Sequence, residues 1–360
     1  MPETRPRIIY NEEGVCNACA WAEEKKTAVD WNVRWKEIED LCDKFRRRNS
    51  NKFDVIVPYS GGKNGAYIAY MLKEKLGMRP LCVTVRPPLE DPVGIKNIEN
   101  FLNCGYDHVQ ITPNPVIGME IDKESFISDG RPMHSHMICI QTVIFKAAVL
   151  FGIPFVMFAE EGETEYGGVT KLKNRPTYDL EDSINLYLSG VDPRKYLKWY
   201  SEKELYWWLH PTKEELMKLD PYIAHWSYFE DFVNYKHYLL AKEKLGLLER
   251  LERSIGTYDN FSATDTTIIF LYFYLMYLKF GFGRTTSEVG CDIRRGALTR
   301  KQGLELVKKF DGEYPEAYIS QYLDYYKMTK EEFDAVLDKH ANKDLFKKVN
   351  GRWVPTFTPH

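Results

Sequence analysis

The sequence has no apolar run long enough to cross a membrane. Its longest such run, residues 268–278, has 11 residues, which suits a buried helix better than a span of about 20. The first residues, MPETRPRIIYNEEG, are polar and contain prolines, so they lack the apolar core of an export signal. We therefore expect a protein that has no membrane span and works in the cytoplasm.

Cysteine is sparse, and neither sign of charge is in large excess. Seven cysteines, an odd number, fit the reduced thiols of a cytoplasmic protein better than a disulfide framework. The 49 basic and 52 acidic residues give a net charge of -3, so the chain as a whole offers no attraction to nucleic acid. With 360 residues, 44% of them apolar, it is long enough for a substantial core.

Three regions differ in their pattern of apolar residues. Residues 1–50 hold a Cys-x-x-Cys pair and a charged helix. Residues 51–185 alternate strand and helix patterns, which predicts an α/β fold with a parallel sheet and helices on both faces. Residues 186–360 show mainly helical patterns, so we expect a mainly helical region that binds substrate or a partner. Its helix starts include three capping boxes, Thr212 with Glu215, Thr299 with Gln302 and Thr329 with Glu332.

The stretch SGGKNG, residues 60–65, follows the first predicted strand and opens a helix. Its glycines let main-chain N–H groups approach an anion, and a helix N-terminus adds partial positive charge. Ser60 adds a hydroxyl group and Lys63 adds a full positive charge. The stretch is not a Walker loop, because no GKS or GKT follows. A phosphate-binding loop and a plain glycine turn both agree with these residues alone.

The stretch resembles the pyrophosphate-binding PP-loop, SGGxDS, of the ATP-pyrophosphatase superfamily, with Asn64 and Gly65 in place of Asp and Ser. Further blocks, among them MHSHMICIQ and FGFGRTTSEVGCDIRRGALTRKQGLELVKKFDG, resemble the N-acetyl sugar amidotransferases over nearly the whole chain. That family belongs to surface-polysaccharide pathways, including lipopolysaccharide and nonulosonate biosynthesis. The resemblance implies a fold of the adenine nucleotide alpha hydrolase kind.

The resemblance also implies a reaction and its partners. ATP would adenylate the amide oxygen of a sugar N-acetyl group, and ammonia would then displace AMP to leave an acetamidino group. The substrate would be an N-acetylated, nucleotide-linked sugar, and the cofactors would be ATP and Mg²⁺. A separate glutaminase and a cyclase-like subunit would supply the ammonia.

Carried onto this chain, the resemblance assigns the nucleotide site to the loop and to the end of the second predicted strand. Lys63 would also act in catalysis, because its charge can stabilise the phosphates during transfer. The residues expected to bind ATP are Ser60, Gly61, Gly62, Lys63, Asn64, Gly65, Val83 and Thr84.

Three carboxylates, Glu160, Glu161 and Glu163, follow an apolar strand pattern in the same region. Mg²⁺ prefers oxygen ligands and substrate phosphates, so we expect Glu160 and Glu161 to hold it. Glu161 is also a candidate for catalysis. The alternative is a solvated acidic loop, which fits poorly at the end of a buried strand.

His134 and His136 precede an apolar helix pattern, with Cys139 shortly after them. We expect His134 to bind substrate and His136 to act in catalysis, since a neutral imidazole could steer ammonia or accept its proton. Cys139 is better explained as a buried thiol. Core packing remains the alternative for both histidines.

Arg284 and Arg294 lie in the C-terminal block, where a forked guanidinium could bind a carboxylate or a phosphate of the substrate. Ordinary salt bridges are the alternative. Cys16 and Cys19 form a knuckle that could hold zinc, but structural zinc usually needs four ligands and this segment offers two.

Two other functions remain open at this stage. A tRNA thiolase on the same scaffold would need cluster-binding cysteines and a basic channel for RNA. A catalytically altered PP-loop protein could instead serve as an assembly partner, for which Asn64 and Gly65 are the best support.

Overall fold

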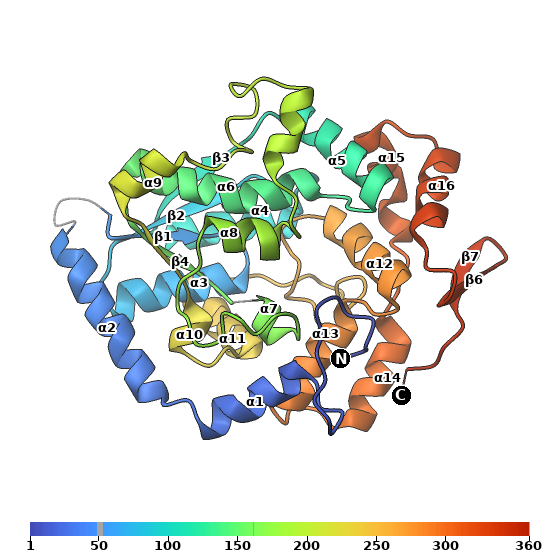
Figure 1. Cartoon of the computed structure of the whole chain (residues 1–360), viewed down its shortest axis with the longest axis horizontal. Helices are drawn as coiled ribbons and strands as arrows, with labels where there is room; N and C mark the ends of the chain where they lie inside the picture. The colour runs from blue at the N-terminus through green and yellow to red at the C-terminus, as the bar shows by residue number, and fades with distance from the viewer. Residues whose placement is uncertain (49–52, 161, 360) are drawn as a thin grey trace.

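A five-stranded parallel sheet lies at the centre of the computed structural model, which describes residues 1–48, 53–160 and 162–359 (Figure 1). The strand order is β3-β2-β1-β4-β5, and every neighbouring pair is parallel. The predicted α/β fold is confirmed. The strands are β1 (Val55–Pro58), β2 (Pro80–Val85), β3 (Asp107–Ile111), β4 (Phe155–Phe158) and β5 (Tyr222–His225).

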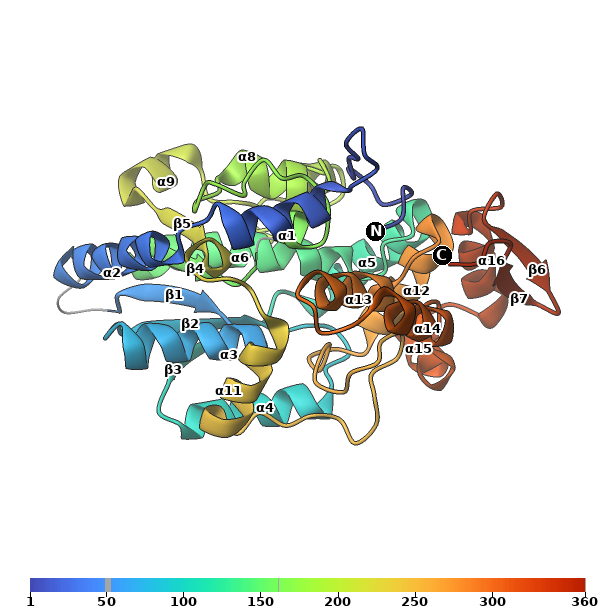
Figure 2. The same ribbon diagram turned by 90° about the horizontal axis from the view of Figure 1, so that it is seen from below.

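Helices cover both faces of the sheet, because successive strand side chains point to opposite sides. Val55 and Val57 pack in a cluster with residues of α2, α3, α4 and α11, whereas Ile56 packs in another cluster with residues of α6. Figure 2 shows α3, α4 and α11 on one side and α6 on the other. These helices are α2 (Trp31–Arg48), α3 (Lys63–Tyr70), α4 (Pro92–Asn103), α6 (His134–Phe151) and α11 (Asn234–Leu245).

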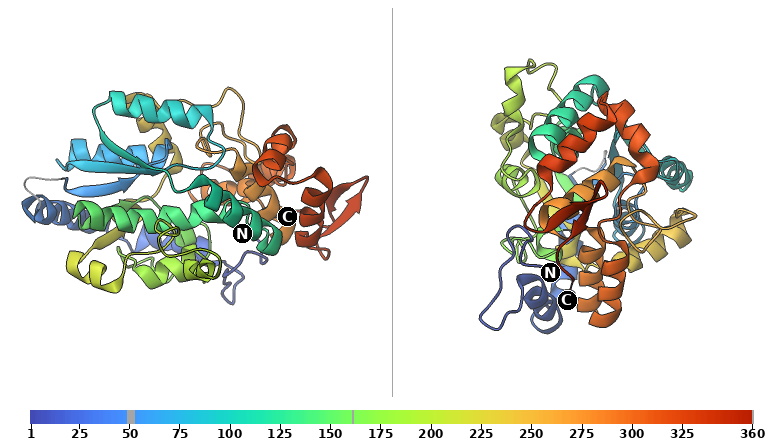
Figure 3. Two further views of the ribbon diagram at one scale, coloured as in Figure 1. Left: turned by 90° about the horizontal axis from the view of Figure 1, so that it is seen from above. Right: turned by 90° about the vertical axis from the view of Figure 1, so that its right-hand side faces the viewer.

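The C-terminal region is mainly helical, as expected, and ends in a small antiparallel hairpin. Figure 3 shows this hairpin at the end of the molecule opposite α2. All three predicted capping boxes are confirmed, at the starts of α9, α14 and α16. The elements are α9 (Lys213–Leu219), α12 (Ile268–Phe280), α13 (Arg284–Arg294), α14 (Arg300–Phe310), α15 (Ile319–Tyr326), α16 (Lys330–His340), β6 (Phe346–Val349) and β7 (Arg352–Pro355).

Strand β5 lies in the region that was expected to be mainly helical. It has only four residues, too few to show an alternating pattern in the sequence, and it completes one edge of the sheet. The sheet therefore continues past residue 185. Helices α1 (Asn17–Thr27) and α5 (Pro115–Asp129) were also not predicted as separate elements.

The C-terminal region meets the sheet at the carboxyl ends of β1 and β2. Asp91 N donates to Asp265 O at 3.0 Å. A Cβ atom on Gly94 would lie 2.4 Å from Thr264 O, and one on Gly61 would lie 2.5 Å from Gly94 O. The backbone segments around Gly61, Gly94 and Thr264 thus pack directly against one another. This packing holds the loop after β1 close to residues 259–267.

Among the described residues, one helix, α6, is long and apolar enough to cross a membrane by length and composition. Within this structure, 72% of it is buried, as in the core helix of a globular domain. Helix α12, the longest apolar run in the sequence, is likewise mostly buried.

Gly65 allows α3 to begin directly against the end of β1. A Cβ atom there would lie 2.6 Å from Pro58 O and 3.1 Å from Tyr59 Cδ2. The glycine at this position, unlike the serine of the PP-loop pattern, therefore has a packing reason.

We expect Gly65→Ala to destabilise the protein. The clash with Pro58 O should cost roughly 1–3 kcal/mol, which exceeds the gain of about 1 kcal/mol that alanine gives a helix. Urea unfolding of both proteins would measure the difference. Gly62→Ala is the matched control, because its added Cβ would meet nothing nearer than Ser60 Oγ at 3.8 Å. Equal losses for the two variants would contradict this explanation.

Candidate active site

A cavity of about 360 Å³, here called the loop cavity, lies at the carboxyl ends of β1, β2 and β4. Its lining brings together most of the residues expected at the nucleotide site, and Phe261 and Asp265 of the C-terminal region close one side. The expected residues that line it are Ser60, Gly62, Lys63, Asn64, Gly65, Val83, His136 and Glu160. The structure thus brings these residues together, although they come from four separate segments.

Lys63, the first residue of α3, is a buried cation with no anionic partner among the residues that the structure describes. Its side chain is only 7% exposed, and Nζ donates to Ser262 Oγ at 3.0 Å. In the part of the chain that the structure describes, no carboxylate lies within salt-bridge distance of it, and burial lowers its pKa. An ammonium group has three donors, so Lys63 retains capacity for an anion in the cavity.

Ser60, earlier in the same loop, contacts the C-terminal region through a carboxylate. Its hydroxyl donates to Asp265, whose pKa is raised by burial. Gly61, with φ of 84°, makes the turn between Ser60 and the helix, and Gly62 precedes the first residue of α3. The first main-chain N–H groups of the helix have no partner within it, so this end of α3 suits an anion.

Asn64 holds Glu160 in place and is itself held by His237. Its Nδ2 donates to Glu160 Oε2 at 3.0 Å, and its Oδ1 lies 3.1 Å from His237 Nδ1. Because an amide oxygen can only accept, His237 Nδ1 carries the proton. Burial lowers the pKa of His237 to about 3, so the ring is neutral at physiological pH. The imidazole ring stacks on the Tyr67 ring, with 3.9 Å between the ring centroids.

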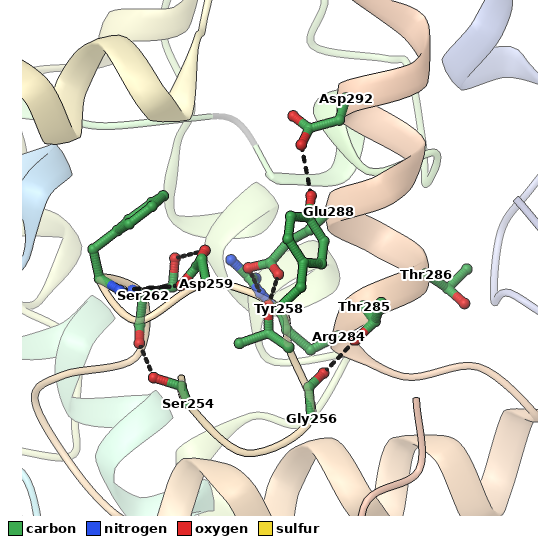
Figure 4. Close-up of polar contacts among 12 residues, drawn as sticks. Ser254, Gly256, Tyr258, Asp259, Ser262, Arg284, Thr285, Thr286, Glu288 and Asp292 are labelled. Atoms are coloured by element: carbon green, nitrogen blue, oxygen red, sulfur yellow. Dashed lines mark hydrogen bonds and ion pairs between the residues drawn. The ribbon is translucent and has the colours of Figure 1, made fainter. Parts of the chain in front are cut away.

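A second cavity of about 370 Å³, here called the α1–α13 cavity, borders the first and shares Phe261 with it. Helix α1, residues 231–235 and helix α13 supply much of its lining. Between the two cavities, Lys63 donates to Ser262, which donates to Asp259 Oδ2 at 2.8 Å. Figure 4 shows the contact between Ser262 and Asp259.

The two predicted arginines have different surroundings. Arg294 lines the α1–α13 cavity. Arg284 lines neither cavity, because its Nε donates to Glu288 Oε1 at 2.6 Å, and Thr257 also donates to that carboxylate (Figure 4). The guanidinium of Arg284 is therefore used in an internal salt bridge, and its expected contact with substrate is not supported.

The two histidines expected at the site also differ. His136 lines the loop cavity, and burial lowers its pKa to about 4, so it is neutral at physiological pH. His134 lines neither cavity, because it begins α6 on the buried side, where its Nε2 has no hydrogen-bond partner among the described residues. Cys139 is a buried core thiol, as favoured from the sequence.

Thr84 does not line the loop cavity, although Val83 does. Neighbouring residues of a strand point to opposite faces, so the Thr84 side chain turns away. Its hydroxyl donates to Tyr59 O and lies 2.7 Å from His108 Nε2. The Thr84 side chain therefore does not face the loop cavity, and its expected contact with adenosine stays a prediction.

Of the expected acidic residues, only Glu160 is placed at the loop cavity. Glu161 lies outside the described residues. Glu163 turns toward the N-terminal segment, where Arg7 Nη2 donates to its Oε1 at 2.7 Å.

Cys16 immediately precedes α1, and Cys19 lies in the first turn of that helix. A hydrogen bond from Cys19 lowers the pKa of the Cys16 thiol. Within the described ranges, no group of three or more His, Cys, Asp or Glu side chains could hold a metal ion. Two thiolates do not make a structural zinc site, so the donor set does not fit zinc.

Several site residues were not expected from the sequence, namely Ser262, Asp265, His237 and Phe261. The closest signal was the polar stretch FSATDTT before α12, which reads as an ordinary loop. Ser262 and Lys63 are 199 positions apart, and no local pattern shows that two such segments meet.

No curated protein sequence matches this chain. A solved structure described as a predicted subunit of tRNA methyltransferase from Methanocaldococcus jannaschii is similar at 15% identity and a TM-score of 0.27, over 52% of this chain and 73% of that chain. Residues 255–357 match the model for the LPS biosynthesis protein WbpG-like, C-terminal domain. Through these residues the chain is similar to a family of lipopolysaccharide biosynthesis proteins, which supports the resemblance found in the sequence.

Proposed function

We propose that this chain is an ATP-dependent amidotransferase that converts the N-acetyl group of a sugar into an acetamidino group. The observation that carries the proposal is Lys63, a buried cation without a carboxylate partner among the described residues, at a glycine loop that opens a helix. Binding of a phosphate would stabilise the buried Lys63 ammonium, because its unused donors would then form charge-assisted hydrogen bonds with the phosphate oxygens. The loop acts as a PP-loop in this proposal.

The phosphates of ATP would bind across the loop. The main-chain N–H groups at the start of α3 and the Lys63 ammonium would face the β- and γ-phosphates, which later leave together as pyrophosphate. The adenosine would extend along the end of β2 beside Val83, which lines the same cavity. Ser60, already bonded to Asp265, would help to fix the loop.

Mg²⁺ fits the side chains of the loop cavity. Glu160 and Asp265 both line it, and Mg²⁺ is usually bound by one or two carboxylates together with substrate phosphates and waters. A cluster of three protein ligands is therefore not required. When bound, the ion would neutralise charge on the phosphates.

The reaction divides into two steps in this proposal. The amide oxygen attacks the α-phosphorus and pyrophosphate leaves, which turns a poor electrophile into an imidate bearing AMP as leaving group. Ammonia then adds to the imidate carbon, AMP departs and a proton is released to give the amidine. Lys63 stabilises the charge that develops on pyrophosphate, and His136, neutral at physiological pH, can hydrogen-bond ammonia without protonating it.

Ammonia would come from separate glutaminase and cyclase-like subunits in the cell, and an ammonium salt can replace them in vitro. With ATP, Mg²⁺, ammonium chloride and N-acetylated nucleotide sugars, we expect AMP, pyrophosphate and a slightly lighter sugar, since NH replaces oxygen. Mass spectrometry and a pyrophosphate assay would detect them. Release of ADP instead of AMP would contradict the proposal.

In the same assay, Lys63→Met should lower the rate by roughly 10²–10³-fold, because one preorganised cation at the phosphates is lost. Lys301→Met is the matched control, because Lys301 is exposed on α14. An unchanged rate in the Lys63 variant would remove the main support for this site.

Replacing Asn64 tests how Glu160 is held. Asn64→Asp puts a second carboxylate at the position where an amide now donates to Glu160. Without Mg²⁺, this should lower the free energy of unfolding at neutral pH by roughly 1 kcal/mol, because the half-buried Glu160 carboxylate loses its donor and faces a second negative charge. The double variant with Glu160→Gln should recover most of this loss, since it again pairs one amide with one carboxylate.

The loss in Asn64→Asp should depend on pH. Like charges raise the pKa of a carboxyl group in the folded state above its unfolded value, so the penalty is absent at acidic pH and grows as pH rises. Urea unfolding between acidic and neutral pH would measure it. Equal stability of Asn64→Asp and the natural protein at neutral pH would show that Asn64 does not hold Glu160.

A further inference from the structure

We propose that the α1–α13 cavity binds a saccharide that carries an anionic group, and that Arg294 binds this anion. The inference rests on the proposed function for the identity of the reaction. Its evidence is the lining of the cavity itself, so binding can be tested without ATP or turnover.

Among the described residues, Arg294 differs from the other cations of this cavity in having no carboxylate partner. Lys25 pairs with Glu165 and Asp231, Lys26 with Glu23 and Arg295 with Asp292. Arg294 Nη2 donates to the main-chain oxygen of Glu165 at 2.8 Å and to Cys291 Sγ at 3.3 Å, neither of which is a carboxylate. No carboxylate lies within salt-bridge distance of Arg294 in the ranges that the structure describes. Since a guanidinium has five donors, it can still bind a carboxylate or phosphate in a forked geometry.

Aromatic rings form much of the rest of the lining. Their polar atoms are partly occupied, since Trp21 Nε1 donates to Glu165 Oε1 at 3.3 Å and the Tyr258 hydroxyl to Asp292 at 2.6 Å. Ring faces and a few placed polar groups are typical of a small-molecule site, and apolar C–H faces of a sugar pack well on such rings. The lining rings are Trp21, Tyr166, Phe232, Tyr235, Tyr258 and Phe261.

The position of the cavity suits a second substrate. Phe261 lines both cavities, and the contacts from Lys63 through Ser262 to Asp259 run between them. A ligand in the α1–α13 cavity therefore lies next to the proposed phosphates. Ala18 and Ala22 are the α1 residues whose small side chains leave this space open. Helix α1 is thus part of the lining of this cavity.

Calorimetry without ATP tests the inference with two probes, UDP-N-acetylglucosamine and the same compound with a carboxylate at C6. Arg294→Gln removes the charge and keeps a donor for the Glu165 carbonyl, and should weaken binding roughly 10- to 100-fold. Arg295→Gln, at the next residue of the same lining, is the matched control and should leave binding nearly unchanged, because Arg295 is already paired with Asp292. Circular dichroism spectra and urea unfolding of each variant, compared with the natural protein, show that it is folded.

The two probes distinguish the source of the anion. Weaker binding of the carboxylate probe alone would assign Arg294 to the sugar acid, and weaker binding of both would assign it to the diphosphate. The inference is overturned if neither probe binds the natural protein, or if Arg294→Gln has no effect or only the effect of Arg295→Gln. Probe binding that depends on Arg294, in a protein that never releases AMP, would refute the proposed function and leave this inference standing.

Discussion

Both cavities depend on the packing of residues 259–267 against the loop that follows β1. The backbone of this segment lies so close to Gly94, and Gly94 so close to Gly61, that no Cβ atom fits at either glycine. The same contact brings Ser262 to Lys63 and Asp265 to Ser60. A segment of the C-terminal domain thereby closes the loop cavity and also forms a wall of the cavity beside it.

Incomplete pairing of charge gives each cavity its chemical character. Most buried charges of this region are paired, as Arg284 is with Glu288 and Lys25 with Glu165. Lys63 and Arg294 have no carboxylate partner among the described residues, and each lines a different cavity. Because a buried charge without a partner is costly, Lys63 favours an anionic ligand. Arg294 is only half-buried, but its forked guanidinium can bind a second anion in the neighbouring cavity. This agrees with a reaction between a nucleotide and a charged sugar, and less well with a protein that serves only in assembly.

The sequence predicted those parts of the site that depend on local pattern. The order of strands and helices, the position of SGGKNG and the approach of Glu160 all follow from apolar periodicity and the direction of parallel strands. Local pattern did not show the orientation of side chains, and neither Thr84, which points to the opposite face from Val83, nor His134, at the start of α6, lines the loop cavity. It could not find His237 or Ser262, because their contacts with the loop join residues 173 and 199 positions apart.

The departures of the loop from the PP-loop pattern have a structural explanation. Gly65 lets α3 lie against Pro58, and Asn64 supplies an amide that bonds both Glu160 and His237. A structure of the protein with Mg²⁺ and α,β-methylene-ATP would show where the nucleotide binds. We expect the phosphates on the main-chain N–H groups of residues 60–65 with Lys63 in contact, and adenosine beside Val83. A nucleotide bound elsewhere, with Lys63 still bonded only to Ser262, would contradict this expectation.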